Sequence, residues 1–227
     1  MSAKGKGRGR DDGGQELKKA RRIVVKIGSK TLATRPDVYA ELAAGCAEAR
    51  KNGQHVVIVS SGAIALGTKK LGYKTRPKEI AKLQAAAAAG QSLLMRAYEE
   101  AFSAAGLEVA QVLLTHADLS HRTRANNARE ALTALLDAGA IPVLNENDSV
   151  AVDEIKFGDN DALSSMVLPL VEGDLLILLS DVPGVLDGES ARIKTVRDVA
   201  KDALPHVRAT KSDVGTGGMG SKIEAAR

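Results

Sequence analysis

The amino-acid sequence predicts an α/β fold, a three-layer αβα sandwich around a mostly parallel central sheet. The main indication is that short, continuous runs of Val, Ile and Leu alternate with longer helix-forming stretches along the chain. Such runs are typical of strands buried on both faces, and strands separated by helices usually pair in parallel. In addition, Gly and Ser follow several of the runs directly, as the short connections of such a sheet require.

The first part of the chain contains three predicted strands and four predicted helices. The strands cover residues 23–27, 55–59 and 107–114. The helices cover residues 37–52, 63–71, 78–104 and 122–138. Helix 78–104 contains the run Ala85–Ala89 followed by Gly90, whose small side chains permit close approach of another helix.

The second part continues the alternation with a strand at 141–144, a helix at 161–172 and a strand at 175–179. A looser segment then extends to about residue 214, and a helix begins near Lys222. Because no repeat or linker interrupts the chain after residue 22, we expect residues 22–227 to form one domain.

The N-terminal tail carries the positive charge of the protein. Residues 1–22 hold eight Lys or Arg against three acidic residues, whereas the rest is close to neutral. The Gly and charge content of residues 1–21 predicts a disordered tail. A nucleic-acid-binding function is not favoured, because the body is neither basic nor rich in the aromatic residues that stack on bases.

Composition points to a cytoplasmic protein. No run approaches the ~20 apolar residues of a membrane span, and the N-terminus lacks the apolar region of a secretory signal. The one cysteine, Cys46, lies in an Ala-rich helical stretch and is expected to be inert core.

The most polar part of the chain is a pair of loops between residues 145 and 164. The first, Asn145–Ser149, follows the predicted strand 141–144, and the second, Gly158–Ser164, leads into the next helix. Asp and Asn are common in capped turns, so each loop alone has an ordinary structural explanation. Two such loops so close together favour a ligand site at the edge of the sheet, with metal binding and acid–base chemistry both open.

Three glycine-containing turns add groups suited to phosphate. Lys26 lies inside a strand just before Gly28-Ser29, where a buried ammonium needs an anion. Ser60-Ser61-Gly62 and Gly215–Lys222 each lead into a helix, where backbone N–H groups can bind anions. The last run is not a Walker A motif, because Ser221 stands where that motif has its lysine. Cationic groups around amide-rich turns fit phosphoryl transfer, which depends on positioning and charge.

Other site chemistries find no support in the sequence. There is no Cys/His cluster for zinc and no G-x-S-x-G element. The four histidines, each expected to be structural or exposed, are His55, His116, His121 and His206.

Five segments together resemble the glutamate 5-kinase family of the amino-acid kinase superfamily, collinearly from about residue 22 to residue 227. They are Val25–Ser29, Val59–Ile64, Pro142–Asp148, Phe157–Asp161 and Gly215–Met219. The pair Asn145-Glu146-Asn147-Asp148 and Gly158-Asp159-Asn160-Asp161 separates this branch from acetylglutamate, aspartate and uridylate kinases. The resemblance implies phosphorylation of the γ-carboxylate of L-glutamate by ATP, giving L-glutamyl 5-phosphate, the first step of proline biosynthesis.

The resemblance also implies residue roles. Lys26 and Lys222 would stabilise the transferring phosphoryl group, with Asp161 orienting both. Glutamate would be bound by Ser61, Asp148 and Asn160, helped by Asp159 and Asn145. ATP would be held by Lys26, Gly28, Ser180, Asp181, Thr216, Gly217, Gly218, Met219, Gly220, Ser221 and Lys222. Mg²⁺ would be held mainly by the nucleotide phosphates, so no protein ligand for it is expected.

Further implications are homo-oligomerisation and feedback inhibition by L-proline. The family's kinase domain continues beyond Lys222, and many members add a PUA domain, so the C-terminal portion of the kinase domain and a PUA domain are expected to be absent from this chain. Two alternatives stay open: another acceptor within the superfamily, or a truncated, non-catalytic relative that binds glutamate or proline.

Overall fold

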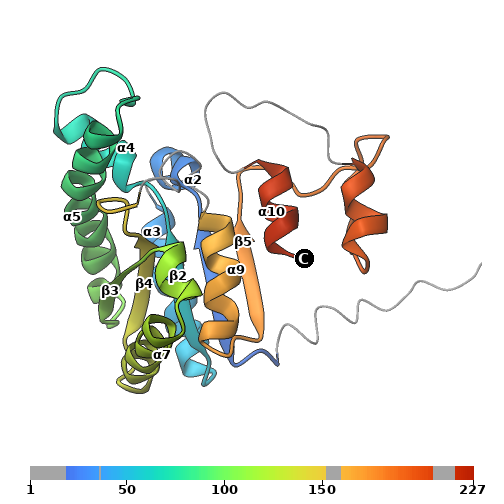
Figure 1. Ribbon diagram of the computed structural model, residues 1–227. Coiled ribbons are helices and arrows are strands. Elements are labelled where there is room, and N and C mark those ends of the chain that lie inside the picture. The colour runs from blue at the N-terminus through green and yellow to red at the C-terminus, as the bar shows by residue number, and fades with distance from the viewer. Residues whose placement is uncertain (1–18, 36, 152–159, 207–217) are drawn as a thin grey trace, which may run out of the picture.

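The computed structural model places a parallel sheet between two layers of helices (Figure 1). It describes residues 19–35, 37–151, 160–206 and 218–227. Five strands are hydrogen-bonded in the order β3-β4-β2-β1-β5, and every neighbouring pair is parallel. Their bounds are β1 Arg22–Ile27, β2 His55–Ser60, β3 Val109–Leu114, β4 Ile141–Glu146 and β5 Leu175–Leu179.

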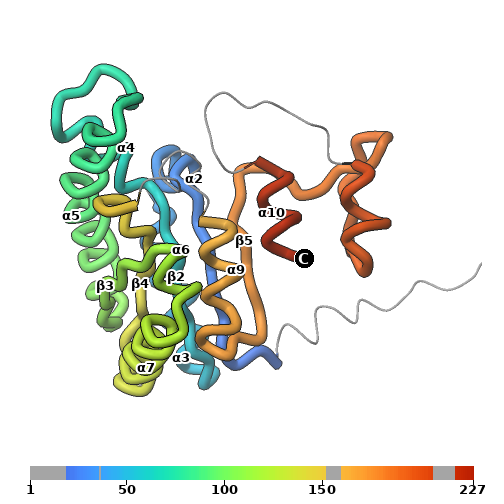
Figure 2. Tube along the Cα trace, in the orientation of Figure 1, coloured from blue at the N-terminus to red at the C-terminus, as the bar shows by residue number. Residues whose placement is uncertain are grey.

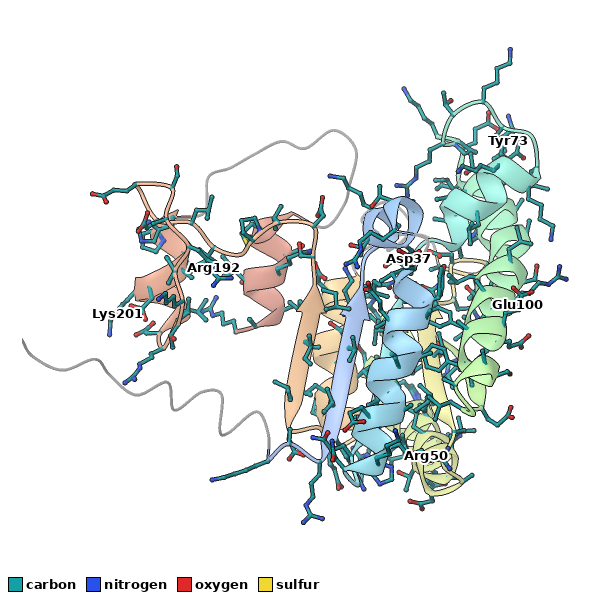
Figure 3. The ribbon with its side chains drawn as sticks, turned by 180° about the vertical axis from the view of Figure 1, so that it is seen from behind. Asp37, Arg50, Tyr73, Glu100, Arg192 and Lys201 are labelled. Atoms are coloured by element: carbon teal, nitrogen blue, oxygen red, sulfur yellow. The ribbon has the colours of Figure 1, made fainter. Side chains whose placement is uncertain are left out.

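The helices divide between the two faces of the sheet. One face is covered by α3 (Val38–Lys51) and α5 (Ile80–Ala104), with α4 (Ala63–Lys70) packed on α5. Helices α7 (Arg122–Asp137) and α9 (Asn160–Leu170) cover the other face. Figure 3, seen from behind, shows α3 in front of the sheet between the labelled Asp37 and Arg50, whereas α9 lies in front of the sheet in Figure 1.

Shorter elements occupy the connections and the C-terminal region. They are α2 (Ser29–Thr34), α6 (His116–Ser120), a π-helical turn η1 (Val199–Ala203), a 3₁₀ turn η2 (Leu204–His206) and α10 (Met219–Ala225). The tube in Figure 2 shows α10 beside α9 and β5, although residues 180–218 separate it from β5 in the sequence.

Strand alternation divides the core into two apolar clusters. On the α3/α5 face, Val56 and Ile58 of β2 pack with Leu94, Tyr98 and Phe102 of α5. On the α7/α9 face, Val57 and Val59 of the same strand join the second cluster, whose helix residues include Leu132, Leu163 and Val167. A strand buried on both faces needs apolar residues at every position, which explains the continuous run 56–59.

Helices α4 and α5 cross with their backbones in close approach. Gly67 and Gly90 are both buried at the crossing. A Cβ atom at Gly90 would lie 2.5 Å from the nitrogen of Gly67 and 2.8 Å from the carbonyl carbon of Ala63. Since Ala63 begins α4 directly after Ser61-Gly62, this crossing fixes the helix that follows β2.

The predicted fold is confirmed, and the sheet is wholly parallel across its five strands. Some predicted bounds were wrong. Asn145 and Glu146 belong to β4 and not to the loop after it, and α2 and α6 were not predicted. The segment after residue 180, expected to be loose, includes η1 and η2. The tail expected to be disordered, residues 1–21, lies almost entirely outside the described residues.

The connections between strands change from one helix layer to the other between β2 and β4. Those after β1 and β2 pass over the α3/α5 face, and those after β3 and β4 lead to helices on the opposite face. Strands β2 and β4 are neighbours in the sheet, so their carboxyl ends flank the point where the layer changes. Open α/β sheets bind ligands in the crevice at such a point.

Across the ranges that the structure describes, no helix is both long and apolar enough to cross a membrane. Cys46 is a free, buried cysteine in the α3/α5 core, as expected.

Candidate functional site

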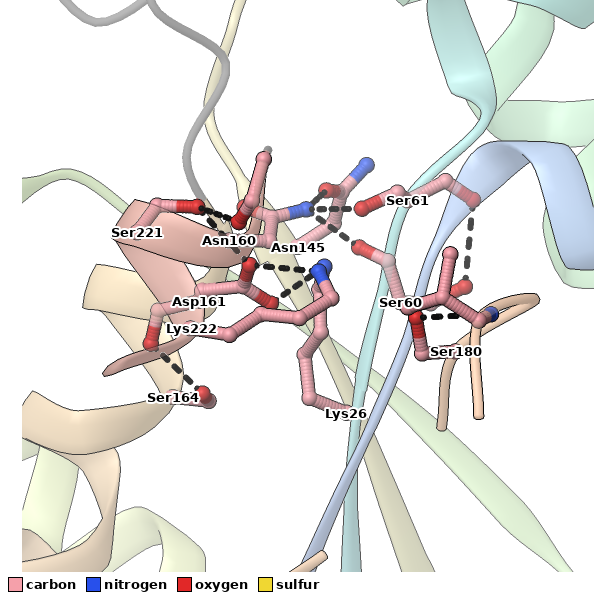
Figure 4. A network of polar contacts seen from close by, with 12 residues as sticks. Lys26, Ser60, Ser61, Asn145, Asn160, Asp161, Ser164, Ser180, Ser221 and Lys222 are labelled. Atoms are coloured by element: carbon pink, nitrogen blue, oxygen red, sulfur yellow. Dashed lines mark hydrogen bonds and ion pairs between the residues drawn. The ribbon is translucent and has the colours of Figure 1, made fainter. Parts of the chain in front are cut away.

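The polar residues of the chain converge at the carboxyl ends of β1, β2 and β4 and at the first residues of α9 (Figure 4). Lys26 comes from β1, Ser60 from β2, Asn145 from β4, and Asn160 and Asp161 from α9. All five are buried, with exposed fractions of at most 6%. So many buried polar groups, at the point where the connections change from one helix layer to the other, indicate a preformed ligand-binding site.

Asp161 bridges two lysines from distant parts of the chain. Its Oδ1 lies 2.6 Å from Nζ of Lys26, and its Oδ2 lies 2.9 Å from Nζ of Lys222. The hydroxyl of Ser221 donates to Oδ2 at 3.2 Å. The Asp161 side chain is fully buried and that of Lys222 is 15% exposed. One carboxylate therefore holds two ammonium groups side by side, as the predicted roles require.

The charge state of this triad follows from its contacts. Burial alone would raise the pKa of the Asp161 carboxyl. The ammonium groups of Lys26 and then Lys222 outweigh burial, and the pKa of Asp161 lies below its ordinary value. Asp161 is thus ionised at neutral pH. With two lysines around one carboxylate, the triad can attract an anion.

Asn160 ties the ends of β2 and β4 together. Its Nδ2 donates to the carbonyl oxygen of Ser60 at 2.6 Å, to Oγ of Ser61 at 2.9 Å and to Oδ1 of Asn145 at 2.9 Å. Beyond Val59 and Leu144 the two strands have no further paired residues, so the amide spans the gap where they separate.

Helix α5 supports this arrangement from behind. The hydroxyl of Tyr98 donates to Oγ of Ser60 at 2.9 Å, and Nδ2 of Asn145 donates to Oε1 of Gln91 at 2.9 Å. Oδ1 of Asn145 also accepts from the backbone N–H of Glu146 at 2.9 Å. Neither Tyr98 nor Gln91 was predicted as a site residue. Their spacing of seven residues puts them on one face of α5, and a polar group repeating on a buried helix face is a signal that could have identified them.

Asp148 lies at the edge of the same region and has an unusual charge balance. Burial and the neighbouring Glu146 carboxylate raise the pKa of Asp148 to about 7, and Arg76 opposes them. Glu146 is itself buried, and its Oε2 lies 3.2 Å from Nδ1 of His116 at the start of α6. The other three histidines are exposed, so all four agree with the expected structural or exposed role.

A larger cavity is lined in part by Lys222 of the triad. It has a volume of about 510 Å³ and is enclosed by the end of β5, the segment 182–185, η1 and α10. Its lining includes Ser180, Met219 and Lys222 among mostly apolar side chains such as Val185, Val199 and Ile223. Mostly apolar cavities of this size with a few polar groups are typical small-molecule sites.

The remaining predicted nucleotide residues surround this cavity or lie near it. Gly218 precedes α10, while Gly220 and Ser221 belong to its first turn. Asp181 follows the cavity residue Ser180 and forms an ion pair of 2.5 Å with Lys30 of α2, a contact that the sequence did not predict. Gly28 lies between the strand that carries Lys26 and the first residue of α2. Asp159, Thr216 and Gly217 lie outside the described residues.

Metal ligands are not clustered in the described ranges, where no group of three or more His, Cys, Asp or Glu side chains could hold an ion. Both oxygens of Asp161 face lysines, which leaves that carboxylate unsuited to a divalent cation.

Comparison with known proteins agrees with this geometry. Residues 21–227 match the model of the amino acid kinase family. The chain is 50% identical over 222 residues to a glutamate 5-kinase of Geobacter metallireducens, covering 93% of this chain and 60% of the relative. It is 49% identical over 216 residues to the glutamate 5-kinase of Thermus thermophilus, covering 92% and 58%. For the glutamate 5-kinase of Streptomyces coelicolor the identity is 48% over 227 residues, covering 94% and 60%.

The chain thus spans about three fifths of the length of the curated relatives that it matches. The match to the family model covers the whole described sheet, both helix layers and the lysine–aspartate triad. The chain therefore belongs to the amino acid kinase family.

Proposed function

We propose that this chain acts as a glutamate 5-kinase, which transfers the γ-phosphoryl group of ATP to the γ-carboxylate of L-glutamate and forms L-glutamyl 5-phosphate and ADP. The observation that carries the proposal is the Asp161 carboxylate, which holds Lys26 and Lys222 beside the amide and hydroxyl groups at the ends of β2 and β4, with Lys222 also lining the 510 Å³ cavity. The names of relatives 48–50% identical to the chain support glutamate as the acceptor.

The amide and hydroxyl groups at the ends of β2 and β4 suit the amino-acid substrate. Ser61, Asn145 and Asn160 present hydroxyl and amide groups that can bind carboxylates, and in its ionised form Asp148 can accept from an ammonium group. Asp159, outside the described residues, is proposed as a further substrate ligand from the family resemblance alone. We place glutamate here with its γ-carboxylate toward the two lysines.

The cavity beside β5 and α10 suits the nucleotide. Apolar residues lining it can enclose a base, and Ser180 lies at its edge. The phosphates would extend toward Lys222, which belongs both to the cavity and to the triad. Gly28, Asp181 and the segment 216–221 are proposed to contribute as well. Mg²⁺ would be held by the nucleotide phosphates and would neutralise part of their charge.

The reaction needs no general base, because the γ-carboxylate of glutamate is already ionised at neutral pH. One of its oxygens bonds to the γ-phosphorus of ATP while the bond to the β–γ bridging oxygen breaks, and ADP leaves with that electron pair. Negative charge on the transferring group is stabilised by the two ammonium groups that Asp161 holds in position. Catalysis then consists of positioning and electrostatic stabilisation, as in other phosphoryl transfers.

Alanine substitutions of the two lysines test the proposal. We expect Lys26→Ala and Lys222→Ala each to reduce glutamate-dependent ADP release about a hundredfold, the effect of removing one charged donor worth roughly 3 kcal/mol. Lys82→Ala is the matched control, because Lys82 is a half-exposed lysine of α5 paired with Glu79. Near-normal turnover in either site variant would contradict the assigned roles.

An acceptor panel of glutamate, N-acetylglutamate, aspartate and carbamate distinguishes the other enzymes of the superfamily. Calorimetry that shows glutamate or proline binding without turnover would instead favour a non-catalytic binding protein. Inhibition by L-proline, assembly into a homo-oligomer and a cytoplasmic location are part of the same proposal. L-Proline would compete with glutamate because both carry an α-carboxylate beside a cationic nitrogen.

A further inference from the structure

A second polar cluster lies next to the glutamate side of the proposed site, and Asp148 is its one member to which substrate binding is assigned above. It consists of Gln91, His116, Glu146 and Asp148, contributed by α5, α6, β4 and the turn after β4. Gln91, Glu146 and Asp148 also line a small cavity of about 10 Å³, together with Ala63 and Ser149. That volume is about what one water molecule occupies.

Two buried atoms of this cluster lack partners within the part of the chain that the structure describes. They are Nε2 of Gln91, a donor, and Oε1 of Glu146, an acceptor. Leaving such groups without hydrogen bonds costs about 1–3 kcal/mol each. A single bridging water can satisfy both a donor and an acceptor on side chains that line one water-sized cavity.

The carboxylates of Glu146 and Asp148 repel each other in a region with little solvent. Both residues are buried, with exposed fractions of 6% and 9%. Among the described residues, the charged or titratable groups around them include Glu146 on β4, His116 on α6, and Arg76 in the connection between α4 and α5. His116 contacts Glu146 and Arg76 acts on Asp148, so each carboxylate has a different cationic or donor neighbour.

We propose that Glu146, held by His116, is a positioning residue that controls the charge of Asp148 and thereby the pH range in which the site accepts an amino-acid ammonium group. The proposal rests on the proposed function, in which Asp148 is the group that receives the substrate's ammonium. Glu146 does not touch the substrate and acts only through its neighbour. Burial and, after it, the neighbouring Glu146 carboxylate favour the protonated form of Asp148, which cannot pair with an ammonium group.

Glu146→Gln tests this role because it keeps the shape of the side chain and removes its charge. A carboxyl group with a pKa of about 7 is ionised in roughly one molecule in eleven at pH 6. Removing the Glu146 charge increases that fraction, and the largest possible gain in affinity for the ammonium group is about tenfold. Burial, the larger cause of the raised pKa of Asp148, remains in Glu146→Gln. We therefore expect this variant to bind glutamate more tightly than the wild type at pH 6, by less than about tenfold, and about equally at pH 8.5.

Two measurements separate this inference from the proposed function. The first is the titration of Asp148 in the ligand-free chain, followed by carboxyl-carbon NMR, and the second is calorimetric glutamate binding from pH 5.5 to 8.5. The matched control is Glu41→Gln, at an exposed residue of α3 that is paired with Arg35. It should leave the titration of Asp148 and the binding of glutamate unchanged. Glu146→Asp keeps the charge and restores a titration midpoint close to that of the wild type.

The outcomes are distinct. An Asp148 midpoint that stays in place in folded Glu146→Gln overturns the inference, whatever happens to binding. If the midpoint falls but glutamate affinity does not follow it, the inference about charge holds and the assignment of Asp148 to the substrate fails. If Glu146→Gln does not fold, the Asp variant decides: a midpoint displaced as far as in a Glu146→Ala chain would refute control by charge.

Discussion

The crossing of α4 and α5 gives the sharpest stability prediction. Replacing Gly90 by alanine adds one carbon atom where the backbone of α4 already lies. The new Cβ would overlap the carbonyl oxygen of Ala63 and lie 2.5 Å from the nitrogen of Gly67, whereas real Cβ contacts essentially never fall below 3.0 Å. The obstructing atoms belong to backbone, so no side-chain rotation relieves the overlap.

The magnitude follows from two opposed effects. Alanine is about 1 kcal/mol better than glycine in a helix interior, which favours the substitution. Overpacking of a close-packed core typically costs about 1–3 kcal/mol and sometimes more, and a backbone-to-backbone overlap belongs at the upper end. We expect Gly90→Ala to reduce the free energy of unfolding by at least about 2 kcal/mol, a large part of the roughly 5–15 kcal/mol typical of a domain.

Urea unfolding of three chains measures the effect: wild type, Gly90→Ala and Gly45→Ala. Gly45 is an exposed glycine in α3, and a Cβ atom added there would have no atom within 4 Å, so its substitution reports helix propensity alone. Gly45→Ala should be slightly more stable than the wild type. Because α4 begins two residues after Ser61, Gly90→Ala should also weaken glutamate binding. Equal stabilities of the two alanine variants would refute the account of the crossing.

Two further predictions concern the buried polar groups. Tyr98→Phe removes the hydroxyl that donates to the fully buried Ser60. Thermal or urea unfolding should show that the free energy of unfolding falls by about 1 kcal/mol. Tyr39→Phe is the control, because Tyr39 is the half-buried ring that contacts Tyr98 in the same core. Burial and Glu146 raise the pKa of Asp148 to about 7, so the folded chain binds more protons than the unfolded chain between about pH 4 and pH 7, and its stability falls as the pH rises through that window. Asp148→Asn cannot ionise and should gain stability over the wild type between pH 5 and pH 8, by at most about 4 kcal/mol, while losing glutamate affinity. If the two chains differ in free energy of unfolding by the same amount at pH 5 and at pH 8, Asp148 is ionised normally.

Much of the fold could be predicted because the apolar runs carry the information locally. The run 55–59 lies between two turn signals and is entirely apolar after His55. Only a strand that is covered by helices on both faces needs such a sequence. Residues 145 and 146 were misplaced because the information about them is not local. A polar side chain at the end of a buried strand looks like a loop residue when its partners, Gln91 and His116, are far away in the sequence.

The triad was accessible to sequence reasoning only in part. A lysine inside the strand 23–27 demands a counter-charge, and that demand can be read locally. The identity of the partner cannot, since Asp161 lies on another element and one carboxylate serves two lysines. The family resemblance supplied the pairing, and the distances of 2.6 Å and 2.9 Å agree with it.

Residues that support the site from behind were the hardest to foresee. Tyr98 and Gln91 lie on a helix whose Ala-rich sequence indicates close packing, and their seven-residue spacing on one face is a signal of a polar partner but not of a ligand. Their importance comes from which groups they meet: Ser60 at the end of β2 and Asn145 at the end of β4. The same helix carries Gly90 at the crossing with α4. Helix α5 therefore positions the ends of β2 and β4 and the helix that begins beside Ser61. A shift of α5 would displace the residues proposed to bind glutamate more than it would displace Lys26 and Lys222.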